Sequence, residues 1–317
     1  MSEKLKTLIV ILGPTAIGKT TIAIDIAQCF NSEIISADAR QFYREMNIGT
    51  AKPSAEELKK VKHHLINSLS VKEDYDVSRF EKDALHHIES IFADHDIAIL
   101  VGGSGLYINA VCNGLDQLPP SESELRLELQ KTFNEKGIEA LQKQLKVLDP
   151  EYHSQVDLHN PHRVIRGIEV CLLTGKKYSS YRTKEKITRP FKIIKAGINT
   201  SRDKLYERIN ARVDEMIANG LVDEVKSLLP YRNYNSLNTV GYKEIFEYLE
   251  ASPPNPLSQG AGEHSEVSMK YAIDKIKQNT RNYVKRQLTW FKRDEEIQWF
   301  ELNQKEEIVH WLNGSLV

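Results

Sequence analysis

The feature that most constrains the fold is the segment Gly13-Pro14-Thr15-Ala16-Ile17-Gly18-Lys19-Thr20. It follows an apolar run of strand length at residues 7–12 and precedes residues 21–27, which can form a helix. A glycine-rich turn in this context points backbone N–H groups inward, and the helix N-terminus adds a positive field. Lys19 then supplies a charge for the terminal phosphates and Thr20 a hydroxyl for Mg²⁺. The segment therefore predicts a binding loop for a di- or triphosphate.

Residues 192–198 predict another strand, and two further apolar runs, at residues 33–37 and 96–101, have strand length. Each is continuous rather than alternating, which is typical of parallel strands covered on both faces. Helical stretches at about 20–30 and 78–93 separate the first strands. We therefore expect an α/β fold with a P-loop NTPase-like parallel sheet flanked by helices.

The stretch between Pro120 and the last of these strands has helical periodicity, and Ser121 with Glu124 predicts a capping box at its start. A helical stretch between two sheet strands indicates an insertion. We expect residues 1–117 and 192–317 to form the P-loop α/β core with C-terminal helices, and residues 118–191 to form a mostly helical insertion domain.

Downstream of the last predicted strand, the pattern indicates one long helix from about residue 199 to 229. Residues 252–266 are rich in Pro, Gly, Ser and Asn, which favours an exposed loop. A second long helix is expected at about 267–292.

The net charge of −1 excludes a uniformly basic nucleic-acid binder, but it conceals an asymmetry. Residues 162–195, the first basic island, contain ten Lys or Arg and two acids. Residues 270–293, the second basic island, contain eight Lys or Arg and one acid. Two basic islands in an acidic chain indicate either a focused contact with a polyanion or two solvated helix faces.

Polar groups follow two of the predicted strands. Asp38 follows the strand at 33–37, and a Gly-Gly-Ser-Gly turn containing Ser104 follows the strand at 96–101. The carboxyl ends of parallel strands form the ligand crevice of an open α/β sheet, so Asp38 can accept a proton or bind a metal there. The alternative is an aspartate that caps a helix. No Walker B pattern is evident, which disfavours an ATPase motor.

The motifs, taken together, resemble the bacterial tRNA dimethylallyltransferases, the tRNA isopentenyltransferases of the IPP transferase family. The resemblance covers nearly the whole chain. The matching motifs are Gly-Pro-Thr-Ala-x-Gly-Lys-Thr (13–20), Ser-Ala-Asp-x-Arg-Gln-x-Tyr (36–43), Ile-Gly-Thr-Ala-Lys-Pro (48–53), His-His-Leu-Ile (63–66), Val-Gly-Gly-Ser-Gly-Leu-Tyr (101–107), Asn-Pro-His-Arg (160–163) with Arg166, Arg-Ile-Asn-x-Arg-Val (208–213), Val-Gly-Tyr-Lys-Glu (240–244) and Asn-Thr-Arg-x-Tyr-x-Lys-Arg-Gln-x-Thr-Trp (279–290).

This resemblance implies transfer of a dimethylallyl group from dimethylallyl diphosphate to the exocyclic amine of the adenosine 3′-adjacent to the anticodon, with release of diphosphate. The implied substrates are tRNAs that read codons starting with U, bound through the anticodon stem-loop, and the implied cofactor is Mg²⁺. The implied catalytic residues are Asp38 as the general base, Lys19, and Arg212 on the diphosphate. The loop Gly13 to Thr20 would hold the diphosphate, and Thr20 the metal.

The resemblance also implies that the 1–117 and 192–317 core is catalytic, that the insertion at residues 118–191 contacts tRNA, and that a set of individual residues does so. Departures from the family pattern are Ala39 in place of the usual Ser, which removes a hydroxyl, Ser104 in place of Thr, and Asn67 in place of Asp. His63 and His64 are interpreted as structural. The implied contacts are Asp38, Ala39, Arg40, Gln41, Ser104, Arg126, His162, Arg163, Val164, Ile165, Arg166, Thr239, Val240, Gly241, Tyr242, Lys243, Glu244, Thr280, Arg281, Lys285, Arg286 and Gln287.

Three alternatives remain at this point. A P-loop kinase of a small metabolite would share Lys19 and Thr20 but leaves the basic islands unexplained. A nucleic-acid-binding module with a nucleotide switch would not need Asp38. An isopentenyltransferase for free adenine nucleotides is the nearest rival, but a free nucleotide does not need the basic islands.

The expected setting is the cytoplasm. No apolar run approaches the roughly 18 residues of a membrane span, and residues 1–6 leave no room for a signal peptide. Cys29, Cys112 and Cys171 are far apart, as expected of reduced thiols. No dimerisation segment is evident, and we expect a monomer.

Overall fold

The computed structural model describes residues 5–183, 186–251 and 261–316. The chain divides into two compact units. The first combines Met1–Asn113 with Arg189–Val317, and the second is Gly114–Thr188. Among the described residues, no helix combines the length and the apolar character needed to cross a membrane.

The first unit is built around a six-stranded sheet in the order β3-β2-β4-β1-β5-β6. All of its strand pairs are parallel, which confirms the predicted α/β class. The four predicted strands are present with ends within one residue of those expected, whereas β3 and β6 were not predicted. The strands are β1 (Thr7–Leu12), β2 (Ile34–Ala37), β3 (His63–His64), β4 (Ile97–Gly102), β5 (Lys192–Asn199) and β6 (Ile297–Glu301).

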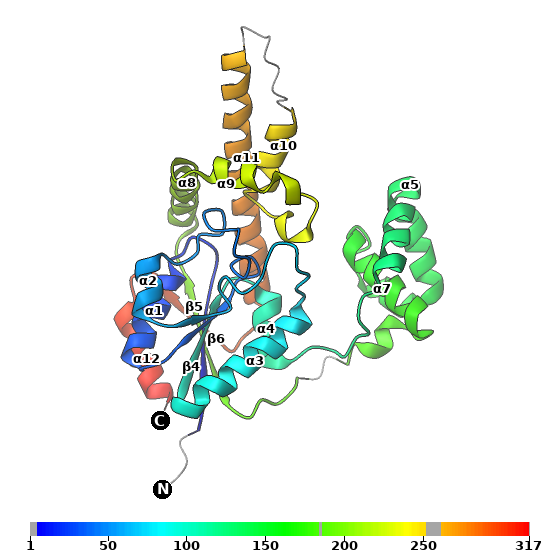
Figure 1. Ribbon diagram of the computed structural model, residues 1–317. Coiled ribbons are helices and arrows are strands. Elements are labelled where there is room, and N and C mark those ends of the chain that lie inside the picture. The colour runs from blue at the N-terminus through cyan, green and yellow to red at the C-terminus, as the bar shows by residue number, and fades with distance from the viewer. Residues whose placement is uncertain (1–4, 184–185, 252–260, 317) are drawn as a thin grey trace. The chain divides into compact units, whose positions relative to one another are not determined.

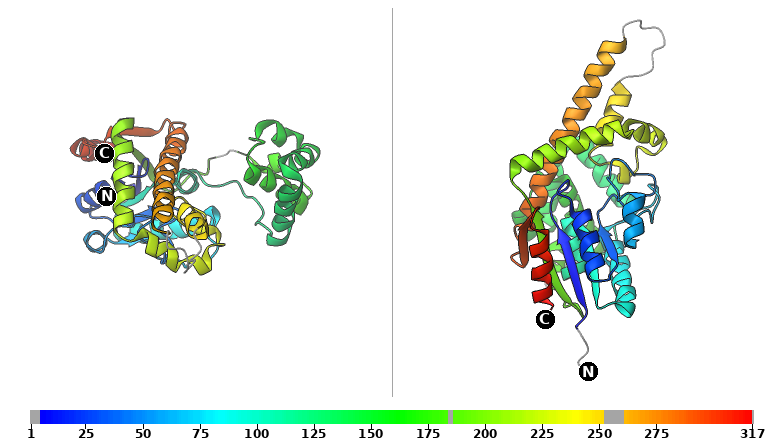
Figure 2. Two further views of the ribbon diagram at one scale, coloured as in Figure 1. Left: turned by 90° about the horizontal axis from the view of Figure 1, so that it is seen from above. Right: turned by 90° about the vertical axis from the view of Figure 1, so that its left-hand side faces the viewer.

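Helices cover both faces of this sheet, as Figures 1 and 2 show. On one face pack α1 (Lys19–Cys29) and α12 (Lys305–Ser315), and on the other pack α3 (Val77–Asp94) and α4 (Gly105–Asn113). Alternate residues of β1 enter the two cores, because successive side chains of a strand point to opposite faces. Burial on both faces explains why these strands are continuous apolar runs.

Beyond β5, the chain forms helices that pack near the carboxyl ends of the strands, where α11 runs beside α8 and α10 (Figure 1). The single long helix expected at 199–229 is wrong, since the chain breaks at Gly220, whose φ of 94° is left-handed. The elements are α2 (Ala55–Lys60), α8 (Arg202–Ala218), α9 (Leu221–Ser227), α10 (Lys243–Ala251) and α11 (Ala261–Phe291), with short 3₁₀ turns at Leu229–Tyr231 and Asn235–Leu237.

The second long helix begins earlier than predicted. Residues 261–266, expected in a loop, belong to α11, while residues 252–260 of that loop lie outside the described residues. Helix α11 therefore starts six residues before the predicted start at 267.

The second unit is helical, with its own apolar core. The predicted capping box at Ser121 is wrong: the residue preceding the first helix is Glu122, and the Ser121 hydroxyl instead donates to the Glu169 carboxylate. This helix is interrupted at Gly137, whose φ is 73°. The elements are α5 (Ser123–Leu148), α6 (Pro150–Gln155), α7 (Pro161–Thr174) and a 3₁₀ turn at Tyr178–Tyr181.

Candidate active site

The phosphate-binding loop connects β1 to α1 and is held in a tightly curled conformation. A Cβ on Gly13 would lie 2.3 Å from the Ile198 carbonyl oxygen of β5, so no side chain fits there. Ala16 adopts a left-handed φ of 63°, which costs a non-glycine residue about 1 kcal/mol or more. Helix α1 begins at Lys19, within the last two residues of the loop motif, so its N-terminus faces whatever the loop binds.

Three side chains fix the loop from different directions. Arg208 Nε of α8 donates to the Ala16 carbonyl at 2.9 Å. The Thr15 N–H donates to Gln287 Oε1 of α11 at 3.0 Å, and Lys19 Nζ donates to the Pro14 carbonyl at 2.7 Å. The loop is therefore pre-organised without a ligand.

Lys19 is electrostatically poised for an anion. Burial lowers the pKa of its ammonium group to about 7, opposed by the charge of Asp38 and reinforced by that of Arg212. Burial is also the main cause that lowers the pKa of Arg212, whose guanidinium nevertheless stays protonated. Because both cations are partly desolvated, a polyanionic ligand would stabilise their charges strongly.

Asp38 lies at the carboxyl end of β2, as the sequence predicted, and no helix begins there, so the helix-cap alternative is wrong. One carboxylate oxygen accepts the Arg40 N–H at 3.0 Å. The residue lines two cavities rather than packing into the core. Its position leaves the carboxylate available to a ligand.

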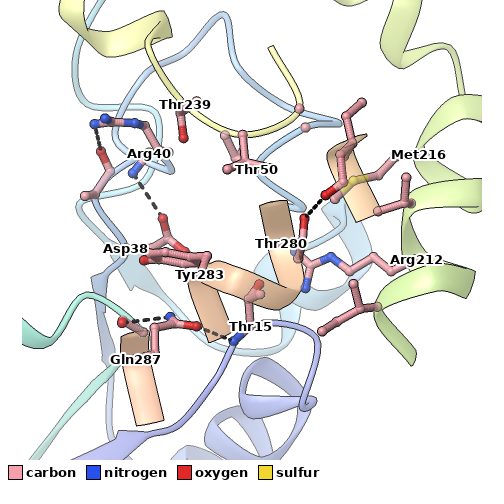
Figure 3. A pocket seen from close by; sticks show the side chains of 18 of the residues that line it. Thr15, Asp38, Arg40, Thr50, Arg212, Met216, Thr239, Thr280, Tyr283 and Gln287 are labelled. Carbon is pink, nitrogen blue, oxygen red and sulfur yellow. Dashed lines mark hydrogen bonds between the residues drawn. The ribbon is translucent and has the colours of Figure 1, made fainter. Parts of the chain in front are cut away.

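Two cavities meet at the loop. The smaller, about 90 Å³, is enclosed by the phosphate-binding loop and by residues that include Ser36, Gln41 and His63. The larger, about 220 Å³, is shown in Figure 3. Both are lined by Thr15, Lys19, Asp38 and Arg212. The remaining lining of the larger cavity is Ala39, Arg40, Gly49, Thr50, Gly103, Ser104, Ile209, Val213, Met216, Thr239, Val240, Gly241, Ile276, Thr280, Tyr283 and Gln287.

Helix α11 supplies one wall of the larger cavity through residues three or four apart, which share one helix face. Tyr283 on this wall interacts with the Ser104 hydroxyl, which also accepts the Ala39 N–H at 3.1 Å. Burial, followed by the charge of Asp38, raises the pKa of Tyr283 to about 12, so the phenol stays protonated. Tyr283 appeared in the sequence only as a motif residue without an assigned role, although its spacing from Thr280 and Gln287 places all three on one helix face.

The structure brings many of the predicted tRNA contacts to this cavity, while others lie elsewhere. Lys285 and Arg286 are exposed on α11, and Arg281 donates to Asn210 Oδ1 at 2.8 Å. Six predicted contacts belong to the second unit: Arg126 is on α5, and His162, Arg163, Val164, Ile165 and Arg166 are on α7.

Several predicted contacts have buried side chains. The Tyr242 hydroxyl donates to Glu224 at 2.6 Å, and Glu244 accepts from the Gly241 N–H at 2.8 Å. Gln287 is bonded to the loop, and Val164 and Ile165 pack in the core of the second unit. The side chains of Tyr242, Glu244, Val164 and Ile165 are therefore turned into the protein, whereas Gln287 also lines the larger cavity.

The two histidines near the smaller cavity hold the sheet edge. His64 Nε2 lies 2.6 Å from a Glu33 carboxylate oxygen, and His63 Nδ1 lies 2.8 Å from the Val61 carbonyl. Across the described parts of the chain, no group of three or more His, Cys, Asp or Glu could hold a metal ion. A metal here would take most of its ligands from Thr20, the substrate and water.

The comparisons with known proteins agree on one family. A model of the family described as IPP transferase matches residues 41–294. A tRNA dimethylallyltransferase of Christiangramia forsetii is 48% identical over 297 residues, which are 94% of this chain and 94% of that protein. A tRNA dimethylallyltransferase 1 of Bacteroides thetaiotaomicron is 45% identical over 306 residues, covering 96% and 95% of the two chains.

Solved structures give the same result. The crystal structure of a full-length tRNA isopentenylpyrophosphate transferase from Bacillus halodurans has a TM-score of 0.70 and 36% identity, with 98% of this chain and 97% of that chain covered. A eukaryotic dimethylallyltransferase, described in crystallographic snapshots of its action on tRNA, has a TM-score of 0.77 and 27% identity. That alignment covers 94% of this chain and 74% of the eukaryotic one.

Proposed function

This chain belongs to the IPP transferase family and has tRNA dimethylallyltransferase activity, and we propose that it binds the diphosphate of dimethylallyl diphosphate at Gly13–Thr20 and the acceptor adenosine beside Asp38. The observation that carries this proposal is the shared lining of the two cavities by Thr15, Lys19, Asp38 and Arg212. The smaller cavity adjoins the loop and suits the diphosphate. The larger suits the allyl group and the base.

The diphosphate is a leaving group, so the site must stabilise charge that grows as the carbon–oxygen bond breaks. Lys19, Arg212 and the N-terminus of α1 provide this charge complement, with both side chains at least partly buried. Pre-organisation of the loop by Arg208 and Gln287 means that these groups need not rearrange during the reaction.

Asp38 serves as the general base. The adenine amine forms a bond to C1 of the dimethylallyl group while the bond between C1 and the diphosphate oxygen breaks. The amine proton passes to the Asp38 carboxylate, and the diphosphate leaves with the bonding electrons. The exocyclic amine of adenine is a weak nucleophile, and a carboxylate that accepts its proton also orients it.

The family implies Mg²⁺, and the residues present fit this ion. Mg²⁺ characteristically keeps several waters and binds substrate phosphates with few protein ligands, so the absence of an acidic cluster among the described residues is compatible with it. Thr20, which lines the smaller cavity, would hold it. When bound, the ion would neutralise charge on the diphosphate.

The adenosine 3′-adjacent to the anticodon, in tRNAs that read codons starting with U, is the proposed acceptor. An adenine must leave its stack to enter this cavity. The exposed basic residues of α11, including Lys285 and Arg286, suit the phosphate backbone of the anticodon stem-loop. Lys19, Asp38 and Arg212 come from one chain, so a monomer suffices.

The proposal is tested by transfer from dimethylallyl diphosphate labelled in the allyl group. We expect label in tRNA, release of one diphosphate per label, and loss of transfer when a chelator removes divalent cations. Lys19→Ala is expected to lower kcat/KM by about 100-fold or more, because it removes a charge from the leaving group. Transfer to AMP but not to tRNA, or unchanged activity in Lys19→Ala, would contradict the proposal.

A further inference from the structure

We propose that Gln287 is a positioning residue for the phosphate-binding loop, and that its side-chain amide sets the affinity for the diphosphate substrate rather than that for tRNA. The inference rests on the proposed function, in which Gly13–Thr20 holds the diphosphate. It departs from the direct tRNA contact that the resemblance implies for Gln287.

Both ends of the Gln287 amide are used inside the protein. Its Oε1 accepts the Thr15 N–H at 3.0 Å, and its Nε2 donates to the Gly103 carbonyl at 2.8 Å (Figure 3). The residue is 6% exposed. A flipped amide would face donor with donor and acceptor with acceptor, so the two bonds fix one orientation. One side chain thus joins α11, the loop after β1 and the turn after β4.

The glycines of the turn after β4 permit this approach. A Cβ on Gly103 would lie 2.4 Å from Gln287 Nε2, and a Cβ on Gly105 would lie 2.3 Å from the Trp290 ring. Both distances are shorter than real Cβ contacts allow. The close contact between α11 and this turn therefore depends on glycine at positions 103 and 105 of the turn and on Gln287 and Trp290 of the helix, apart from the hydrogen bonds.

The exposed side of the same helix contrasts with this contact. Lys285 and Arg286 are exposed, whereas Val284 and Gln287 are buried. The buried face of α11 holds the phosphate-binding loop and lines the cavity, while the exposed face carries basic residues suited to phosphate. Both groups of the Gln287 amide are bonded within the protein, so removing this amide and removing charge from the exposed face should affect different substrates.

The test is Gln287→Met, which keeps the length of the side chain and removes both hydrogen bonds. We expect the KM for dimethylallyl diphosphate, measured at saturating tRNA, to rise roughly five- to tenfold, as loss of a buried hydrogen bond predicts. The Kd for tRNA should stay within about twofold. The matched control on the exposed face, Lys285→Met, should weaken tRNA binding and leave that KM unchanged.

Two results would overturn the inference: an unchanged KM for dimethylallyl diphosphate in folded Gln287→Met, or a raised Kd for tRNA, whether alone or together with the KM. If Gln287→Met does not fold, Gly103→Ala decides by the same two measurements, because its Cβ displaces the Gln287 amide. Lys19→Ala distinguishes failure of the proposed diphosphate site from failure of the positioning role of Gln287. If it leaves the KM unchanged, the loop does not hold the diphosphate; if it raises the KM and Gln287→Met does not, only the positioning role fails.

Discussion

At the scale of single residues, the site depends on cations that are already partly desolvated in the folded protein. Binding an anion therefore costs them little further desolvation. Lys19 is the clearest case, with a pKa of about 7 that burial sets and Asp38 and Arg212 modulate. A nearby diphosphate favours the protonated form and raises this pKa in the complex. Binding therefore takes up a proton at neutral and alkaline pH.

The pH dependence of diphosphate affinity follows from that linkage. Below pH 7, Lys19 is protonated in both states, and the affinity should not change through this group. As pH rises from about 7 to the higher pKa of the complex, affinity should fall by up to tenfold per pH unit. Titration calorimetry in buffers of different ionisation enthalpy measures the proton uptake. Any binding that Lys19→Arg retains should lack this step, since arginine stays protonated; an equal step in both proteins would contradict the assignment to Lys19.

The position of a residue at the cavity can be predicted from the sequence where a motif fixes the spacing, but not where its partners are remote in the chain. The loop motif placed Lys19 and Thr20 at the cavity, and the end of a strand placed Asp38 there. The sequence could not show that Gln287 bonds to Thr15, because no local pattern relates residues 272 positions apart. The same limit applied to Tyr283, whose partners Ser104 and Asp38 lie on other elements.

At the scale of elements, α11 combines a buried face, which bonds to the loop after β1, with an exposed basic face. Continuous apolar runs made β1, β2 and β4 predictable to within a residue, and β5 was predicted equally well although it carries Lys192 and Lys195. Edge strand β6 was missed because it is only partly buried, and β3 because it has two residues. The break between α8 and α9 was missed although Asn219-Gly220 is a recognisable helix stop.

The exposed basic face of α11 makes a prediction about salt. Replacing Lys285 and Arg286 with alanine should reduce the slope of log K for tRNA against log salt by up to about two, roughly one per lost phosphate contact. Filter binding over a range of KCl concentrations measures the slope. Replacing Lys59 and Lys82, exposed lysines outside the predicted tRNA segments, removes the same charge and should leave the slope unchanged. Equal effects of the two pairs would refute a focused contact.

At the scale of the whole molecule, a parallel sheet brings segments from both ends of the chain to one edge. The phosphate-binding loop, Asp38 after β2, Ser104 after β4, Arg212 of α8 and the wall of α11 meet around adjoining cavities. The combination of motifs along the chain identified this family from the sequence, whereas the loop alone indicated only a polyphosphate ligand. Membership in the family decides against the kinase and nucleotide-switch alternatives.

The most direct test of the account is the single-turnover rate of Asp38→Asn with tRNA bound and dimethylallyl diphosphate saturating. Asparagine keeps the size of the side chain and an acceptor for the Arg40 N–H, but it cannot take the amine proton. We predict a rate about 10²- to 10⁴-fold below that of the unaltered enzyme, with the Kd for tRNA within about twofold. A rate within tenfold of the unaltered enzyme, or loss of tRNA binding with a normal rate in the complex that does form, would contradict the role of Asp38 as the base.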